Sequence, residues 1–386
     1  MVQSDCRFFN GYKPCGKSPV CDANCSSRNI PRTRLLIIHL GAMGAVVRST
    51  ALLAAIHRKF PAAHLTWVTQ APMHLLLMNH PLIDRVLTTS LEDQLALRAL
   101  EFDAAFVVDK SLAASGLLRS TSADLVFGFV ADARTGGIAP ATAHAEELWR
   151  LGLDDHQKFF VNKKTENQLI HEALDLGPYL RDDYDLRLSR EEEFEAQARH
   201  RLWSLRSDQP VIGFNTGCGP LMPAKKWTVD FHRQVIEKLL AQGHRNLVLL
   251  GGPEDRERNE AIGLGLPVIQ SETSRGVRDG LQSLAACDLI VTGDSFGLHL
   301  GISMKKFMIA WFGPSCAHEI ELYGRGVKLM TEASCSPCWK RHCAKDKMCY
   351  DQIQIRTIEE ALAEGFNWWT AQVPASQPQT LDVNPI

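Results

Sequence analysis

The residues best suited to chemistry lie at positions 291–299, where an apolar stretch ends in small polar side chains. Gly293, Asp294 and Ser295 follow the apolar residues, and a helical pattern begins at Phe296. In such a turn, free backbone N–H groups and the positive end of the helix dipole can hold an anion, typically a diphosphate. The segment therefore predicts a phosphate-binding turn.

Two upstream segments repeat this pattern. Residues 211–217 form an apolar strand that enters a loop containing Thr216, and Lys225 precedes an amphipathic helix. Residues 247–254 form another apolar stretch, which ends in glycines, a proline and Glu254. Because parallel strands end at one edge of a sheet, we expect the three loops to meet where open α/β sheets bind ligands. The alternative for any single loop is that its glycines only separate a strand from a helix.

The elements that must position these loops follow a strand–helix alternation, which is typical of parallel sheets. Strands are predicted at 34–40, 65–69 and 102–110, a helix at 46–59, a helical and charged connection at 141–207, a second strand–helix series at 210–317, and a helix at 357–369. The fold class is therefore α/β, with two Rossmann-like domains. The predicted boundaries are 1–30 for a cysteine-rich segment, 31–190 and 208–356 for the two domains, and 357–386 for a C-terminal helix and a poorly ordered tail from Val373.

Composition narrows the class of protein. The chain has 386 residues, which favours two domains, and its 45% hydrophobic and 22% charged residues are typical of a soluble globular protein. No apolar run approaches the roughly 20 residues of a membrane span, and the first thirty residues lack the apolar core of a signal peptide. We therefore expect a cytoplasmic protein. A net charge of -2 without a dense basic stripe argues against nucleic acid as a partner.

Eleven cysteines call for an explanation in a chain of this class. Eight form two groups near the chain ends, namely Cys6, Cys15, Cys21 and Cys25, then Cys335, Cys338, Cys343 and Cys349. Such groups favour metal ligation over disulfides in the absence of a secretion signal. The second group contains C-x2-C, so it is the stronger metal candidate, with zinc, iron or an iron–sulfur cluster as the alternatives. Cys218, Cys287 and Cys316 lie in or beside apolar strands and are predicted to be packing residues.

Taken in order, these segments resemble glycosyltransferase family 9, the ADP-heptose:lipopolysaccharide heptosyltransferases and their relatives. The resemblance runs from about residue 34 to residue 353. It rests on LGAMG at 40–44 with RST at 48–50, NTG at 215–217, KKW at 225–227, LGGPE at 250–254, GDS at 293–295 with His299, and FGPS at 312–315.

The resemblance implies a GT-B fold whose C-terminal half binds a nucleotide-diphospho-sugar and needs no catalytic metal. Lys225 would neutralise the diphosphate, Thr216 and Gly217 would contact it, and Glu254 or Asp255 would bind the ribose hydroxyls. Ser295, Phe296 and Gly297 would donate backbone N–H groups to phosphate. Asp294 would contact a sugar hydroxyl or orient the loop, because a carboxylate repels a diphosphate. His299 would orient the loop or donate a proton near the leaving phosphate, although a packing role fits equally.

Other segments are similar to a cysteine-containing branch of that family. They are residues 151–155 with Lys158 and Phe159, residues 321–326, and the two cysteine groups. Some members of that branch transfer heptose to protein hydroxyls and bind iron through cysteines, so the resemblance makes a bound metal plausible. Two aromatic residues near the second group, Trp339 and Tyr350, are too few to predict a subunit contact.

The largest departure from the family is at Ala45. An inverting transferase needs a general base to take the proton of the acceptor hydroxyl, and family members carry Asp after the second glycine of this loop. Alanine cannot accept a proton. Asp109, which follows a neighbouring strand, is the leading replacement, although Asp109 with Lys110 would also fit a structural ion pair. His39 is a second candidate base, for which a packing role is favoured.

Two functions from different classes remain in competition. The first is an inverting transfer of a heptose or related sugar to a hydroxyl of a cell-envelope glycan or of a protein, with peripheral contact with the inner membrane as an additional expectation. The second is a nucleotide-sugar-binding or assembly module that has lost its base. A cofactor-binding oxidoreductase is disfavoured because neither half contains G-x-G-x-x-G with its acidic residue.

Overall fold

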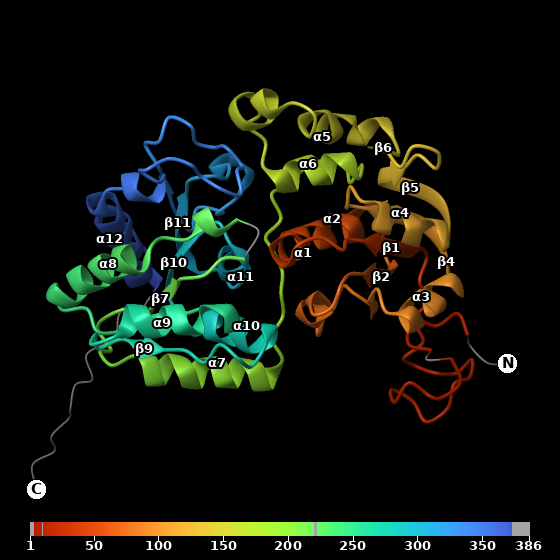
Figure 1. Cartoon of the computed structure of the whole chain (residues 1–386). Coiled ribbons are helices and arrows are strands. Elements are labelled where there is room, and N and C mark those ends of the chain that lie inside the picture. The colour runs from red at the N-terminus through yellow and green to blue at the C-terminus, as the bar shows by residue number, and fades with distance from the viewer. Residues whose placement is uncertain (1–3, 10, 220–221, 373–386) are drawn as a thin grey trace, which may run out of the picture.

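Each half of the chain forms a six-stranded sheet covered by helices, and the two lobes lie side by side (Figure 1). The computed structural model describes residues 4–9, 11–219 and 222–372. The strand orders are β3-β2-β1-β4-β5-β6 and β12-β11-β10-β7-β8-β9, so both lobes repeat the order 3-2-1-4-5-6 when each is numbered from its own first strand. All pairs are parallel except β5 with β6. The predicted class with two Rossmann-like domains is confirmed.

The strands have the following bounds: β1 (Arg34–Ile38), β2 (His64–Val68), β3 (Arg85–Leu87), β4 (Glu101–Val107), β5 (Ser122–Ala131), β6 (Ile138–Pro140), β7 (Ile212–Asn215), β8 (Leu247–Leu250), β9 (Ile269–Gln270), β10 (Leu289–Gly293), β11 (Phe307–Phe312) and β12 (Gly326–Met330). The first and third predicted strands were too long at their carboxyl ends. The reason is that Asp109, just beyond β4, turns back to accept backbone N–H groups of the loop after β1.

The α-helices are α1 (Met43–Ser49), α2 (Leu52–Lys59), α3 (Leu91–Arg98), α4 (Leu112–Arg119), α5 (Glu146–Leu151), α6 (Glu166–Ala173), α7 (Arg190–Trp203), α8 (Val229–Ala241), α9 (Arg256–Gly263), α10 (Val277–Ala285), α11 (Phe296–Ser303) and α12 (Ile355–Gln372). The prediction of one continuous helix at 46–59 was wrong, because a break at Thr50 separates α1 from α2. The Thr50 hydroxyl donates to Val47 O at 2.6 Å and accepts the Asp185 N–H at 2.8 Å. Among the described residues, no helix is both long and apolar enough to cross a membrane.

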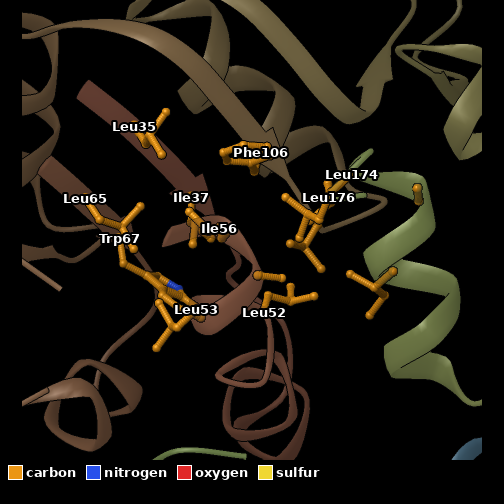
Figure 2. Close-up of a cluster of buried hydrophobic side chains, with 14 of the residues drawn as sticks. Leu35, Ile37, Leu52, Leu53, Ile56, Leu65, Trp67, Phe106, Leu174 and Leu176 are labelled. Carbon is orange, nitrogen blue, oxygen red and sulfur yellow. The ribbon is translucent and has the colours of Figure 1, made fainter. Parts of the chain in front are cut away.

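Each sheet is buried on both faces, as its continuous apolar strands require. In the N-terminal lobe, β1 side chains such as Leu35 and Ile37 pack between α2 and the side chains of Trp67 and Phe106 (Figure 2). Burial of this kind contributes about 25 cal/mol per Å² of apolar surface removed from water, and it fixes the strand ends whose loops carry the polar residues.

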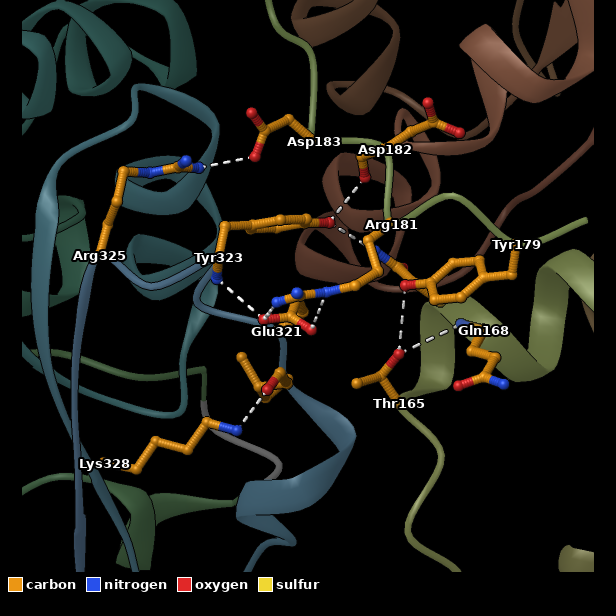
Figure 3. A network of polar contacts seen from close by, with 12 residues as sticks. Thr165, Gln168, Tyr179, Arg181, Asp182, Asp183, Glu321, Tyr323, Arg325 and Lys328 are labelled. Atoms are coloured by element: carbon orange, nitrogen blue, oxygen red, sulfur yellow. Dashed lines mark hydrogen bonds and ion pairs between the residues drawn. The ribbon is translucent and has the colours of Figure 1, made fainter. Parts of the chain in front are cut away.

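The chain crosses between the lobes through residues 174–189, which form turns up to residue 178 and lack regular secondary structure from 179 to 189. Helix α7 follows and packs on α10 of the C-terminal lobe. Polar contacts fasten this segment to both lobes (Figure 3). Arg181 pairs with Glu321 at 3.0 Å, and the Tyr323 hydroxyl donates to Asp182 O at 2.8 Å. Arg325 pairs with Asp183 at 2.7 Å. Residues 321–326, which were singled out in the sequence, therefore hold the connection between the lobes.

Candidate active site

The lobes meet where α1 packs against α11. Gly44 lies directly against the His299 ring, because a Cβ at Gly44 would lie 2.5 Å from His299 Cδ2. The His299 ring also stacks on Tyr184, with the centroids 6.0 Å apart. Burial and the nearby Arg48 guanidinium lower the pKa of His299 to about 3. His299 is therefore a neutral side chain at neutral pH, positioned between the two lobes.

Asn215 organises the turn between β10 and α11. Its amide donates to Thr292 Oγ1 and to Ser295 Oγ, each at 2.9 Å. Gly297 lies so close that a Cβ there would meet the Asn215 amide at 2.5 Å. The Ser295 side chain makes no capping hydrogen bond to its own helix. The first turn of α11 therefore presents backbone N–H groups without a side-chain cap, which is the arrangement that binds anions.

Lys225 and Asp294 form an ion pair beside this turn. Lys225 ends a short 3-10 turn (η4, Pro223–Lys225), and its Nζ lies 2.6 Å from Asp294 Oδ2. Burial would raise the pKa of Asp294, but the Lys225 ammonium holds it below its ordinary value. The pair places one ammonium group next to the uncapped start of α11.

The other predicted donor residues divide into one exposed carboxylate and three buried groups. The Thr216 hydroxyl donates to Asn259 at 2.5 Å and is buried, while Gly217 is packed against the Asp255 carboxylate. Asp255 accepts the Gly252 N–H at 2.9 Å, and burial raises its pKa. Glu254 is exposed at the surface of the same loop. The structure therefore leaves Glu254 free to meet a ligand and uses Asp255 to join two loops.

Asp109 closes the glycine loop of the N-terminal lobe. Its carboxylate accepts the Leu40 N–H and, at 3.1 Å, the Gly41 N–H. Burial raises the pKa of Asp109, while these two N–H groups and Lys110 oppose the rise. His39 Nε2 lies 3.8 Å from Asp109 Oδ1, and burial, Arg48 and Lys110 lower the pKa of His39 to about 3. Asp109 is thus an ionisable group in contact with the glycine loop that precedes Ala45, whereas His39 is a buried neutral imidazole.

Comparison with known proteins identifies the family. Residues 94–349 match the model of glycosyltransferase family 9 (heptosyltransferase). The chain belongs to glycosyltransferase family 9. Over 300 residues it is 23% identical to lipopolysaccharide heptosyltransferase 2 of Escherichia coli K12, which covers 73% of this chain and 83% of that protein.

Solved structures share the fold. A family 9 glycosyltransferase from Veillonella parvula has a TM-score of 0.70 at 19% identity, covering 88% of this chain and 99% of its own. The E. coli ADP-heptose lps heptosyltransferase II has a TM-score of 0.62 at 18% identity, with 87% and 99% covered. The iron-containing dodecameric glycosyltransferase TibC from enterotoxigenic E. coli H10407 has a TM-score of 0.54 at 11% identity, with 88% and 78% covered. These likenesses establish a GT-B-like fold for this member of family 9.

Two charged residues that sequence reasoning passed over complete the interlobe site. Arg48 of α1 is buried and pairs with Glu166 of α6 at 2.7 Å. Glu319 ends a 3-10 turn of the C-terminal lobe (η6, Ala317–Glu319) and lies 3.7 Å from Lys158 of the other lobe. Burial and the nearby Glu166 raise the pKa of Glu319 to about 7, against the effects of Lys158 and Arg48. The only signal for Arg48 in the sequence was its place in the RST segment, and no pattern marked Glu319.

The cysteines of this family 9 chain are arranged differently at its two ends. In the second predicted group, burial together with the Cys338 and Cys343 thiols raises the pKa of Cys349 to about 11. Cys335 lies in the same loop. Cys6, Cys15, Cys21 and Cys25 are partly buried in the segment that packs on the N-terminal lobe. Within the described parts of the chain, Cys316, His318 and Glu319 form the one group of three possible metal ligands whose atoms all lie within 4.8 Å of one another, so neither predicted cysteine group is gathered to this distance.

The three remaining cysteines are Cys218, Cys287 and Cys316, and all of them are buried. Cys287 packs under Gly213 in the sheet of the C-terminal lobe. Cys316 is buried, and its thiol also belongs to the group of possible metal ligands formed with His318 and Glu319.

Proposed function

We propose that this family 9 protein transfers a heptose, or a related sugar, from a nucleotide diphosphate such as ADP-heptose to an acceptor hydroxyl. The observation that carries the proposal is the junction of three features at one edge of the second sheet. The uncapped start of α11, the Lys225 ammonium and the exposed Glu254 offer N–H donors, a positive charge and a carboxylate. Diphosphate and ribose hydroxyls need these groups.

In the bound state, Lys225 would exchange part of its contact with Asp294 for the diphosphate, and Ser295, Phe296 and Gly297 would donate to the phosphate oxygens. Asp294 then keeps the Lys225 ammonium desolvated and oriented, instead of contacting phosphate itself. His299 separates the donor turn from Gly44 and, as a neutral ring, acts through packing. The leaving diphosphate would thus be stabilised by an ammonium and a helix start, with no metal required.

We propose Asp109 as the general base in place of the residue lost at Ala45. The acceptor hydroxyl would lose its proton to an Asp109 oxygen while its own oxygen attacks the anomeric carbon and the diphosphate leaves from the opposite face. Burial favours the basic character that this step needs, since it raises the pKa of the carboxylate. The Leu40 and Gly41 N–H groups would hold the carboxylate in one orientation.

The acceptor we favour is a glycan of lipopolysaccharide, because the named relative acts in lipopolysaccharide assembly. We place this reaction in the cytoplasm, at the inner face of the inner membrane. A protein hydroxyl is the second candidate, and the specific observation in its favour is the cysteine-rich loop combined with likeness to an iron-containing transferase. Cys335, Cys338, Cys343 and Cys349 would hold the metal once their thiols are drawn together. The ion would then serve a structural role, because it would crosslink one loop.

The direct test is turnover of ADP-heptose by the purified protein with lipopolysaccharide acceptors of truncated core and with a protein acceptor. Lys225→Ala should abolish release of ADP. The parent could instead bind the donor without turning it over, with activity appearing only in Ala45→Asp. That result would show that the natural chain is a nucleotide-sugar-binding module and not an enzyme.

A further inference from the structure

Trp339, in the loop that carries the second cysteine group, lies against the lysine of the donor site. The ring centroid is 4.7 Å from Lys225 Nζ, within the range of a cation–π contact. The same ring lies 5.2 Å from Nζ of Lys158, which belongs to the other lobe. One indole therefore touches the proposed diphosphate lysine and a lysine across the lobe boundary.

The protein backbone imposes this position on Trp339. The backbone N–H of Trp339 donates to Pro314 O at 2.8 Å, and the backbone N–H of Cys338 donates to the same oxygen at 3.1 Å. Pro314 follows β11, the neighbour of β10, so the loop is fastened beside the β10–α11 turn. These two hydrogen bonds fix the backbone from which the indole extends toward Lys225 and Lys158.

The conformation of Trp339 is itself unusual. Its φ is 49°, in the left-handed region that bulky residues rarely adopt. Such strain persists where surrounding contacts over-determine it, and it concentrates at ligand-binding and catalytic sites. Trp339 remains 37% exposed although its ring contacts two lysines. A strained backbone that presents a partly open aromatic ring to the donor lysine indicates a role at the site.

We infer that Trp339 is a positioning residue of the donor site, where its indole holds the Lys225 ammonium in the orientation that meets the diphosphate. This inference rests on the proposed function. A lysine has many rotamers, and restricting them before the ligand arrives reduces the entropy lost on binding. The cation–π contact with the ring would also stabilise the Lys225 ammonium when the diphosphate draws it away from Asp294.

The test is calorimetric titration of ADP into the full chain and its variants. Trp339→Leu should raise the dissociation constant of ADP roughly threefold to thirtyfold, because leucine packs but has no π face, whereas Trp339→Phe should stay within about threefold. Phe194→Leu, an exposed aromatic on α7 remote from the site, is the matched control and should leave the constant unchanged. Melting temperatures show whether each variant is folded.

Two outcomes would overturn the inference. One is Trp339→Leu binding ADP as tightly as the parent while Lys225→Ala binds weakly. The other is Trp339→Phe binding ADP as weakly as Trp339→Leu, because the loss would then not depend on an aromatic face at this position. If Lys225→Ala itself binds ADP like the parent, the donor site of the proposed function fails first, so the two failures are distinguishable.

Discussion

The two lobes repeat one strand order, yet they use the same structural position for different chemistry. In each sheet an aspartate follows the fourth strand, Asp109 after β4 and Asp294 after β10. Asp109 accepts backbone N–H groups of the loop after β1, while Asp294 pairs with the Lys225 ammonium. Asp109 therefore occupies backbone N–H groups of a neighbouring loop, whereas Asp294 pairs with a side chain and leaves the backbone N–H groups at the start of α11 without a carboxylate partner.

The helices that follow differ in the same way. Ser111 caps α4 by accepting the Ala114 N–H at 3.2 Å. Ser295 occupies the corresponding position before α11, but its hydroxyl accepts from Asn215 instead. The start of α4 is thus capped by a side chain, and the start of α11 is not. Under the proposed function, these side-chain pairings in a repeated topology decide which lobe binds the phosphate.

The largest effect should come from removing the ionisable group of Asp109. Asp109→Asn keeps an oxygen for one of the two loop N–H groups but cannot take a proton at neutral pH. If Asp109 is the base, the turnover number should fall about 10²- to 10⁴-fold, while the dissociation constant of ADP stays unchanged. Asp93→Asn, which alters a carboxylate that accepts the Thr88 N–H in the same lobe, is the control for structural loss. Equal rates in the parent and Asp109→Asn would remove Asp109 from the mechanism.

The junction between the lobes should be the next most sensitive. Gly44→Ala places a methyl group against the buried His299 ring, and overpacking of this kind costs about 1–3 kcal/mol of unfolding free energy. Gly116→Ala in α4, where a Cβ meets open space, should be neutral or stabilising by about 0.5–1 kcal/mol. Denaturant unfolding of both variants measures the difference. Two equal values would show that α1 does not pack on α11 as described.

A pH-dependent effect should follow from Glu319. Its pKa is raised to about 7 in the folded chain, so the folded state holds the proton more tightly than the unfolded state. The stabilisation is therefore present at low pH and is lost as pH rises from the ordinary glutamate value through about 7, by at most about 3 kcal/mol. Histidines with lowered pKa values make the folded chain more stable as pH rises, which opposes the effect of Glu319. Because the parent and Glu319→Gln share these histidines, comparing the two proteins isolates the contribution of Glu319. The difference in unfolding free energy should change between pH 5 and pH 8, and a constant difference would contradict the shift.

The smallest effect should come from removing the Ser111 cap of α4, the helix whose start corresponds to that of α11. Ser111→Ala removes a true cap and should lower the unfolding free energy by about 1 kcal/mol without changing the affinity for ADP. Calorimetric titration and denaturant unfolding of one sample measure both quantities. Weaker ADP binding in Ser111→Ala would mean that the N-terminal lobe contacts the nucleotide.

Much of this comparison could be predicted from the sequence. The apolar runs located the strands. The glycines with Lys225 and Ser295 located the strand ends at which we propose the donor site, because chain order suffices for that. The orientation of Thr216 toward Asn259, and of Asp255 toward Gly217 and Gly252, could not be predicted. Such orientations depend on partners that lie tens of residues away.

The same limit explains the residues that were missed. Arg48 forms an ion pair with Glu166, and the Trp339 ring lies against the Lys225 ammonium. Both contacts join residues far apart in the sequence, so no local pattern predicts them. Asn215 was part of a recognised segment, but its hydrogen bonds to Thr292 and Ser295 exist only once β7 and β10 are paired. Local sequence specified the elements, and tertiary pairing specified the chemistry at their ends.

The most direct measurement is a crystal structure of the protein with ADP bound. We expect the diphosphate within about 3.5 Å of Lys225 Nζ and of the backbone N–H groups of Phe296 and Gly297, at the start of α11. A diphosphate bound instead at the loop between Leu40 and Gly44, with Asp109 displaced from its N–H groups, would contradict this expectation.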